Sequence, residues 1–522
     1  MGADQAWLPD VPPPPAPSES AEGPAREVRR ETVPRLKPID RQQMVLRPVV
    51  VEALIAEDHP ARAIWDFVGR LDLRRYREQV RSVEGSAGRP AFDPHLLVSL
   101  WVYSYSRGVS SARAIERLCE YDPAYQWLTG LEGISGHTLS DFRVAHADAL
   151  HELFVQVLAL LSAEGLVTLE RVMQDGTKVR ACAASKRFRR TPRIEAMLAQ
   201  ARAVVETLEA QTEDESSLQQ QRARERAARE KRQRLEAALQ EFDKLEAAHS
   251  TVDRVSTTDP EARIMKQADG GSAPNYNVQI STDAAHSLIV GIEVTQAGSD
   301  YQQLTPAMDR LEQTGPRAPA QVVVDGGYIS SANILAMATR GIDLIGPEPQ
   351  SHAAEANRRK SYQHYGVTPA YEASMFRYDP ATNTYVCPQG RPLRYDAKYE
   401  RGGTMSYRYK AAEDDCRTCP AKALCCPRTR RGRSIERREP VPEIAAFRQK
   451  MQTDDARAIY RTRSQVAEFP NLWIKAKLGV RQFRVRGVPN VGLESLWAAL
   501  TYDIQQWIRL RWRPRVAARA TA

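Results

Sequence analysis

Hydrophobic residues between positions 41 and 165 recur at intervals of three or four, which is the spacing of helices that bury one face. Asp93 followed by Pro94 has the form of a helix N-cap with proline in the first turn. The pattern is clearest in three segments, 60–68, 93–101 and 110–118. We therefore predict an all-α domain over residues 41–165.

A different pattern follows this helical region. Segments 305–313 and 331–338 keep helical spacing, but they lie between runs rich in β-branched residues. The first strand-like run begins near Val167, and others follow at 276–283, 287–295, 321–325 and 343–345. Runs 276–283 and 287–295 should pair as a hairpin. The alternation predicts an α/β fold with a mixed sheet over residues 166–510.

Two insertions interrupt the predicted sheet domain, and two tails flank the folded part. Residues 191–248 are charged, with apolar residues at helical spacing on both sides of a polar stretch, which predicts a helical hairpin. Residues 380–438 form a small cysteine-rich β insertion. Residues 1–40 are rich in proline and predicted to be disordered, and residues 511–522 form a basic tail.

Three acidic residues stand out against this pattern of elements. Asp325 follows the apolar run Val322-Val323-Val324 and precedes two glycines, so we expect it at the end of a strand. Asp175 has a similar setting before Gly176, and Glu468 is expected on a helix. Carboxylate oxygens are the ligands that Mg²⁺ prefers, and two such ions can promote phosphodiester chemistry. The three acids therefore predict a site for divalent cations.

The net charge bears on the partner. The 522 residues include 74 Lys and Arg against 65 Asp and Glu, a net charge of +9. The excess gathers at 186–193, 428–438 and 507–515, which favours either a polyanionic partner or a solvated basic surface. No apolar segment reaches the length of a bilayer span. We expect a soluble protein of the cytoplasm, associated with the nucleoid, without a membrane partner.

Five of the seven cysteines gather in the predicted β insertion. Cys416 and Cys419 have the spacing of a metal knuckle, with Cys387 upstream and the adjacent Cys425 and Cys426 downstream. These residues predict a structural zinc bound by Cys387, Cys416, Cys419 and either Cys425 or Cys426. Reduced, buried thiols are the alternative. The other two cysteines, Cys119 and Cys182, are expected in the core.

The short helices of residues 121–143 resemble a helix-turn-helix. Thr138, Ser140 and Arg143 are then the candidates to face DNA. An ordinary helical bundle with polar caps explains the same residues equally simply.

Several motifs together resemble the DDE transposases of bacterial insertion sequences, over roughly residues 40–510. They are Asp175-Gly176-Thr177-Lys178, the hairpin 276–283, the segment 321–328, the series Tyr460, Arg463, Glu468 and Lys475, and the segment 479–487. The resemblance implies an RNase H-like catalytic domain in which Asp175, Asp325 and Glu468 bind two Mg²⁺ ions, with Mn²⁺ able to substitute.

The same resemblance assigns further roles. It makes Tyr460, Arg463 and Lys475 a signature that faces DNA, and we expect one side of one helix to present them with Glu468. Pro470 predicts a kink or restart of that helix. The basic residues beside this helix, Arg481, Arg484 and Arg486, are expected to contact DNA phosphates.

The implied activity is binding of double-stranded DNA at terminal inverted repeats, cleavage of the DNA and transfer to target DNA, by a homodimer in the synaptic complex. Two alternatives stay open at this point. The first is a DNA-binding regulator whose catalytic domain is silent. A structure-selective nuclease would use the same three acids without strand transfer.

Overall fold

The computed structural model describes residues 41–42, 44, 48–80, 82, 90–209, 218–267, 270–315, 317–348, 360 and 362–521. Within the chain, residues Val50–Ala522 form one compact unit. The predicted disordered tail, residues 1–40, lies outside the described residues, as does the turn of the predicted hairpin at 210–217.

The predicted helical region is present. Its elements are η1 (Val51–Leu54), α1 (Pro60–Val68), α2 (Arg74–Arg77), α3 (Pro94–Ser106), α4 (Ala112–Tyr121), α5 (Pro123–Thr129), α6 (Gly136–Ala145) and α7 (Ala147–Ala163). The Asp93 side chain caps α3 by accepting a hydrogen bond from His95 N, and Pro94 occupies the first turn, as predicted. No single helix among the described residues has the length and apolar character of a membrane span; only α6 and α7 together, as a bent pair, meet that criterion.

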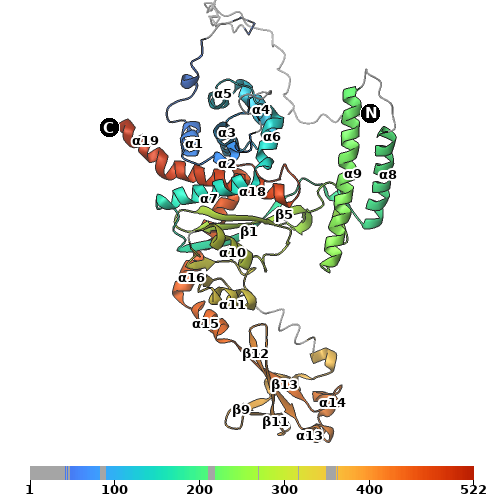
Figure 1. Ribbon diagram of the computed structural model, residues 1–522. Coiled ribbons are helices and arrows are strands. Elements are labelled where there is room, and N and C mark those ends of the chain that lie inside the picture. The colour runs from blue at the N-terminus through green and yellow to red at the C-terminus, as the bar shows by residue number, and fades with distance from the viewer. Residues whose placement is uncertain are drawn as a thin grey trace, which may run out of the picture. The chain divides into compact units, whose positions relative to one another are not determined.

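The predicted mixed sheet is also present, and it has six strands (Figure 1). They are β1 (Arg171–Arg180), β4 (Arg263–Lys266), β5 (Ser272–Asp283), β6 (Leu288–Thr295), β7 (Gln321–Val323) and β8 (Asp343–Ile345). β1 lies between β5, which runs antiparallel to it, and β7, which runs parallel to it. β6 forms the expected hairpin with β5, and β8 runs parallel to β7. The connecting helices are α10 (Leu304–Thr314) and α11 (Ser331–Thr339).

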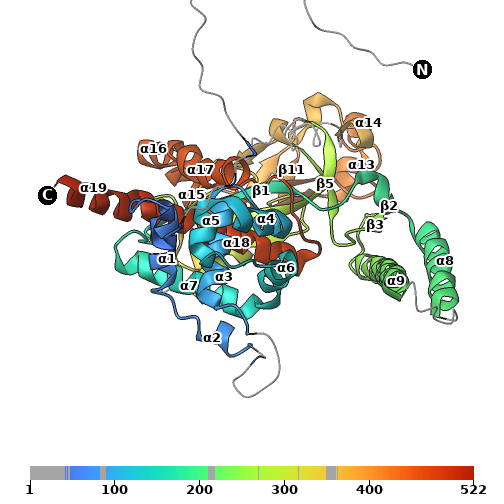
Figure 2. The same cartoon turned by 90° about the horizontal axis from the view of Figure 1, so that it is seen from above.

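Alternate residues of the central strands face opposite sides of the sheet, as the two-residue repeat of a strand requires. Val172 and Val322 belong to the main hydrophobic core. Met173 and Val323 instead pack against the two helices α16 (Asp454–Arg461) and α17 (Arg463–Ala476), which lie near β1 in Figure 2. The sheet therefore has one face covered by α17.

The helix α18 (Val488–Trp507) joins the helical region to the sheet. It contacts β6 on one side and α3, α6 and α7 on the other, and most of its residues are buried. A single hydrophobic core runs through both regions as a result. The chain then continues through a π-helical turn, Ile508–Trp512, into α19 (Arg513–Thr521), so the predicted basic tail is helical.

Both insertions have their own small cores. The charged insertion forms the expected pair of long helices, α8 (Thr191–Glu209) and α9 (Leu218–Ala247), which lie side by side, with η2 (Ser185–Arg187), β2 (Phe188–Arg189) and β3 (Val255–Ser256) at its base (Figure 1). The cysteine-rich insertion forms an antiparallel five-stranded sheet. Its elements are η4 (Pro369–Tyr371), η5 (Ala373–Met375), β9 (Arg377–Asp379), β10 (Thr384–Val386), β11 (Pro392–Arg401), β12 (Thr404–Ala411), α13 (Glu413–Arg417), α14 (Lys422–Cys425) and β13 (Ser434–Pro440), and α15 (Pro442–Lys450) follows.

The shared core of α18 makes a stability prediction. Leu500 is fully buried on α18, whereas Leu472 on α17 is 66% exposed. Leu500→Ala should lower the free energy of unfolding by about 2 to 5 kcal/mol because it leaves a cavity. Leu472→Ala should change it by less than about 0.5 kcal/mol. Thermal and urea unfolding of both variants would measure this, and equal effects would contradict the central place of α18.

Candidate active site

The pairing of β1 with β7 brings two of the three predicted acids together. Arg171 pairs with Gln321 and Met173 with Val323 in parallel register. Asp175 and Asp325 each lie two residues beyond the last pair, so they occupy corresponding positions and face the same side as Met173 and Val323. Asp325 follows its strand as predicted. Asp175 does not end its strand, because β1 continues to Arg180 along β5.

The helix α17 contacts both aspartates. Arg463 Nη2 donates to Asp175 Oδ1 at 2.9 Å and lies 3.7 Å from Asp325 Oδ2. The side chains of Arg463 and Asp175 are 12% and 15% exposed, whereas that of Asp325 is 39% exposed. One guanidinium group therefore bridges two carboxylates, of which one is largely buried and the other partly exposed.

Residues four apart on α17 continue this contact along β1. Asn471 Nδ2 donates to Asp175 Oδ2 at 3.0 Å, and Lys475 Nζ donates to Thr177 Oγ1 at 2.5 Å. Lys475 was a predicted site residue, whereas Asn471 was not, and Thr177 was named only as part of the motif 175–178. The spacing Arg463, Ala467, Asn471, Lys475 is a signal that could have found Asn471, because residues four apart share one helix face.

The third acid lies beside this stripe. Glu468 is exposed on α17, one residue after the buried Ala467 and one turn before Asn471. Among the residues that the structure describes, no three His, Cys, Asp or Glu side chains form a ready-made metal site. Convergence of Glu468 with Asp175 and Asp325 on one cation therefore stays a prediction.

The structure decides two expectations about the helix. Of the predicted kink or restart at Pro470, the restart is wrong, because α17 runs from Arg463 to Ala476 with Pro470 inside it. The break instead falls at Thr462, between α16 and α17. Tyr460 therefore lies on a different helix from Arg463, half-buried against the cluster that contains Met173 and Val323. The short segment between the two helices, rather than the proline, sets this local geometry.

Burial changes the protonation of the central carboxylate. The pKa of Asp175 is raised to about 6, mainly because burial disfavours its charge; the Arg463 guanidinium opposes this shift, and Asp325 adds to it. Burial lowers the pKa of Lys475, and Asp175 opposes that change. The site thus holds charges that are weakly solvated.

A buried polar network supports the opposite side of β1. Gln279 Oε1 accepts hydrogen bonds from Gln174 Nε2 at 3.1 Å and from Tyr328 Oη at 2.6 Å. Gln279 Nε2 donates to Asp300 Oδ1 at 2.6 Å. A Cβ atom at Gly176 would lie 2.6 Å from that nitrogen, which explains why glycine follows Asp175. Tyr328 thereby anchors the turn that carries Asp325.

The predicted arginines lie on a loop attached to the end of β1. Gln482 forms a parallel bridge with Arg180, and Phe483 N donates to Arg180 O at 2.9 Å. Arg481, Arg484 and Arg486 are exposed on this loop. The structure therefore places three cationic side chains at the end of the strand that carries Asp175.

The candidates on α6 have a different setting. Arg143 is only 6% exposed: its Nη1 donates to Ser110 O at 2.9 Å, and its guanidinium lies over the Trp101 ring. Arg143 is therefore a structural residue, and its prediction as a DNA contact is corrected. Thr138 and Ser140 are half-buried, and the Thr138 N–H donates to the N-cap Ser135. Direct base contact through Thr138 and Ser140 stays a prediction.

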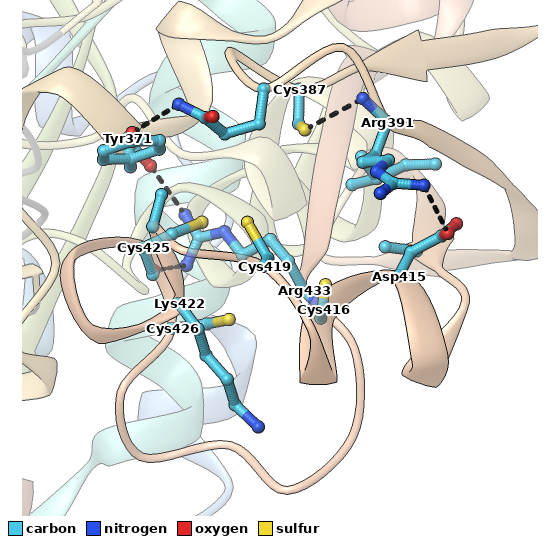
Figure 3. Close-up of a pocket in the computed structure, with 14 residues that line it drawn as sticks. Tyr371, Cys387, Arg391, Asp415, Cys416, Cys419, Lys422, Cys425, Cys426 and Arg433 are labelled. Atoms are coloured by element: carbon cyan, nitrogen blue, oxygen red, sulfur yellow. Dashed lines mark hydrogen bonds and ion pairs between the residues drawn. The ribbon is translucent and has the colours of Figure 1, made fainter.

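The cysteines fall into two groups, and only one of the two predicted core cysteines, Cys119, is in the core. Cys387, Cys416, Cys419, Cys425 and Cys426 line one cavity in the β9–β13 sheet region (Figure 3). Cys119 is buried in α4, and Cys182 is half-buried after β1.

Comparisons with known proteins agree with the resemblance seen in the sequence. Residues 386–508 match the family described as "Transposase DDE domain", and residues 49–145 match "Transposase domain (DUF772)". The first match includes Glu468, Arg463 and Lys475, whereas Asp175 and Asp325 lie outside both. The resemblance to DDE transposases of insertion elements is thereby confirmed.

The solved structures that are similar to this chain include the piggyBac transposase synaptic complex with hairpin DNA. The identity is 8%, the match covers 88% of this chain and 81% of that chain, and the TM-score is 0.23, too low to support a structural argument. No curated protein gave a significant match.

The raised pKa of Asp175 predicts how stability depends on pH. A carboxyl group with a raised pKa in the folded state stabilises the fold below its unfolded pKa and loses this effect as pH rises through about 6. In the metal-free wild type, ionisation of this one group should lower the free energy of unfolding by about 1.4 kcal/mol between about pH 5 and pH 7.5. In Asp175→Asn this pH-dependent loss should be absent. The difference in Tm between Asp175→Asn and wild type should therefore rise with pH, and a constant difference would contradict the assignment.

Proposed function

We propose that this DDE transposase of an insertion element binds terminal inverted repeats, cuts the DNA backbone and joins the cut end to target DNA. The observation that supports this most directly is the pairing of Asp175 and Asp325 beneath α17, the helix that also carries Glu468 and Lys475. The resemblance supplies the order of the steps, and the geometry supplies a site with the required chemistry.

The residues present fit divalent cations such as Mg²⁺ or Mn²⁺. Two carboxylates already share one positive charge, the guanidinium of Arg463. Asn471 Oδ1 is buried beside Asp175 without a hydrogen-bond partner in the described part of the chain. Carboxylate and amide oxygens are hard ligands of the kind these ions prefer. We propose that Asp175, Asp325 and Glu468 hold the ions.

Each residue then has a distinct task. When bound, divalent ions activate the attacking oxygen and stabilise the leaving oxygen at a phosphodiester. Arg463 bridges the two carboxylates in the absence of other cations, and its guanidinium can pair with a DNA phosphate once these carboxylates have other partners. Lys475 holds its ammonium group next to Thr177 and close to Asp175. Asn471 orients the Asp175 carboxylate.

The DNA would pass over the exposed loop at the end of β1. Arg481, Arg484 and Arg486 give this loop its positive charge, which suits contacts to phosphates. We also propose that two copies of the chain act together on two DNA ends, as the resemblance implies. The half-buried Tyr460 would contribute to the site by packing under it rather than by an exposed DNA contact.

The carboxylates give a direct test of catalysis. Asp175→Asn, Asp325→Asn and Glu468→Gln should each lower cleavage of DNA that carries the terminal repeat by at least about 100-fold, because each removes a ligand charge worth several kcal/mol. DNA affinity should change by less than about threefold. Asp455→Asn, an exposed acid on α16, is the matched control. Gel assays of cleavage and binding would measure both properties.

Three other outcomes would change the proposal. A wild-type protein that binds the repeat but never cuts it would be the silent regulator. Cleavage without joined products would identify a nuclease. Full activity of Glu468→Gln would remove Glu468 from the site and leave only the paired aspartates.

The loop arginines make a prediction about salt. Arg481→Gln, Arg484→Gln and Arg486→Gln should weaken binding to repeat and scrambled duplexes equally, because phosphate contacts carry no sequence information. Each change should reduce the slope of log K against log salt by about one. Arg417→Gln, 69% exposed on the cysteine-rich insertion, is the control. A loss confined to the repeat duplex would mean that the loop reads bases instead.

A further inference from the structure

Five cysteines line one cavity in the β9–β13 insertion (Figure 3). None of them has a task in the proposed reaction. The cavity holds about 20 Å³ of free volume, enough for one small atom rather than for an organic ligand. The thiols come from three separate stretches of chain: Cys387 after β10, Cys416 and Cys419 at the end of α13, and the adjacent Cys425 and Cys426 at the end of α14. All seven cysteines of the chain are free thiols.

Two of the sulfur atoms already accept backbone hydrogen bonds. Arg391 N donates to Cys387 Sγ at 3.3 Å, and Arg433 N donates to Cys416 Sγ at 3.3 Å. The first bond needs a tight turn, in which Gly390 N donates to Cys387 O at 2.8 Å and Gly390 has φ +75°. These hydrogen bonds fix the positions of the two sulfur atoms at the cavity.

Cationic side chains gather around the cysteines. Arg391, Lys422 and Arg433 line the same cavity, and the only carboxylate among its lining residues, Asp415, is paired with Arg391 at 3.3 Å. Burial raises the pKa of Cys425 to about 12 and also raises that of Cys426, so the thiols themselves are neutral there. Sulfur ligands at this spacing are those that a soft divalent ion prefers.

The insertion has little else to stabilise it. Its separate core contains seven buried residues, and two of these are Cys425 and Cys426. Domains with such small cores commonly depend on a structural metal or on disulfides. Among the described side chains no three potential ligands meet at metal distance, so binding would require the thiols to turn inward toward the cavity.

We propose that this cavity is a structural zinc site, with Cys387, Cys416, Cys419 and one of the adjacent pair Cys425 and Cys426 as ligands. Four thiolates satisfy the tetrahedral preference of zinc. Only one of the two adjacent residues is needed, because Cys387, Cys416 and Cys419 supply the other three ligands; Cys425 is the last residue of α14 and Cys426 follows it with non-helical backbone angles. The other cysteine of the pair stays in the small core. The site is independent of the carboxylates and of the proposed reaction.

Metal content of the full-length protein without a tag tests this directly. After equilibration with zinc sulfate and gel filtration, elemental analysis should find about one zinc per chain. A mercurial reagent that titrates thiols should release it, and Co²⁺ in its place should give the visible bands of tetrahedral cobalt thiolate. Less than about 0.2 zinc per chain, with all thiols reduced and titratable, would overturn the proposal. These readouts need no variant.

Variants then assign the ligands. Cys387→Ser and Cys416→Ser should each lower zinc content at least about fivefold and weaken the cobalt bands, and one of Cys425→Ser and Cys426→Ser should do the same. Cys182→Ser, half-buried after β1, should keep wild-type zinc, as should Asp175→Asn. Wild-type zinc content in Cys387→Ser and Cys416→Ser would overturn the site. Loss of zinc with full DNA cleavage would leave the proposed function intact, and the reverse would count against that function alone.

Discussion

The candidate site depends on the parallel register between β1 and β7. Because Met173 pairs with Val323, the two residues that follow at the same interval, Asp175 and Asp325, must share one side and one level of the sheet. A shift of one residue would turn one carboxylate to the opposite face, where Gln174 and Gln279 form a different, buried network. Apolar residues on both faces of the sheet fix this register, and the register in turn fixes the position of Asp175 relative to Asp325.

The burial of Asp175 has an electrostatic cost that the fold offsets only in part. Arg463 and Asn471 both contact the carboxylate, yet burial still raises its pKa to about 6. An ion pair that served stability alone would be more favourable if the carboxylate were better solvated or had a second cation close to it. The arrangement is instead typical of functional sites, where like charges are held together for a cation or a substrate. Asp300, which accepts a hydrogen bond from Gln279 on the opposite face, adds to the rise in the pKa of Asp175.

The sequence predicted the elements well but not their lateral contacts. Strands, helices and both insertions follow from local periodicity, which depends on neighbours a few residues away. Nothing local shows that β1 lies between β5 and β7, so the prediction that Asp175 and Asp325 share a site came from their residue type and from the resemblance, not from periodicity. Asn471 escaped notice because an isolated asparagine on a helix carries no signal until its partner strand is known. The burial of Arg143 escaped the local pattern for the same reason, because it comes from contacts with Ser110, the Trp101 ring and Glu494 on α18.

Proline in a helix shows how tertiary packing overrides a local rule. Pro470 removes one hydrogen bond from α17, and isolated helices usually kink or end at such a residue. Here Pro470 is buried, and Ala467 and Ile474 on either side of it are buried too, so packing against the sheet holds the helix together. The lost hydrogen bond leaves a carbonyl free within the turn that carries Glu468. The position of Glu468 on α17 is therefore set by the packing of Ala467 and Pro470, and the contacts of Arg463 and Lys475 with β1 hold the same helix at both ends.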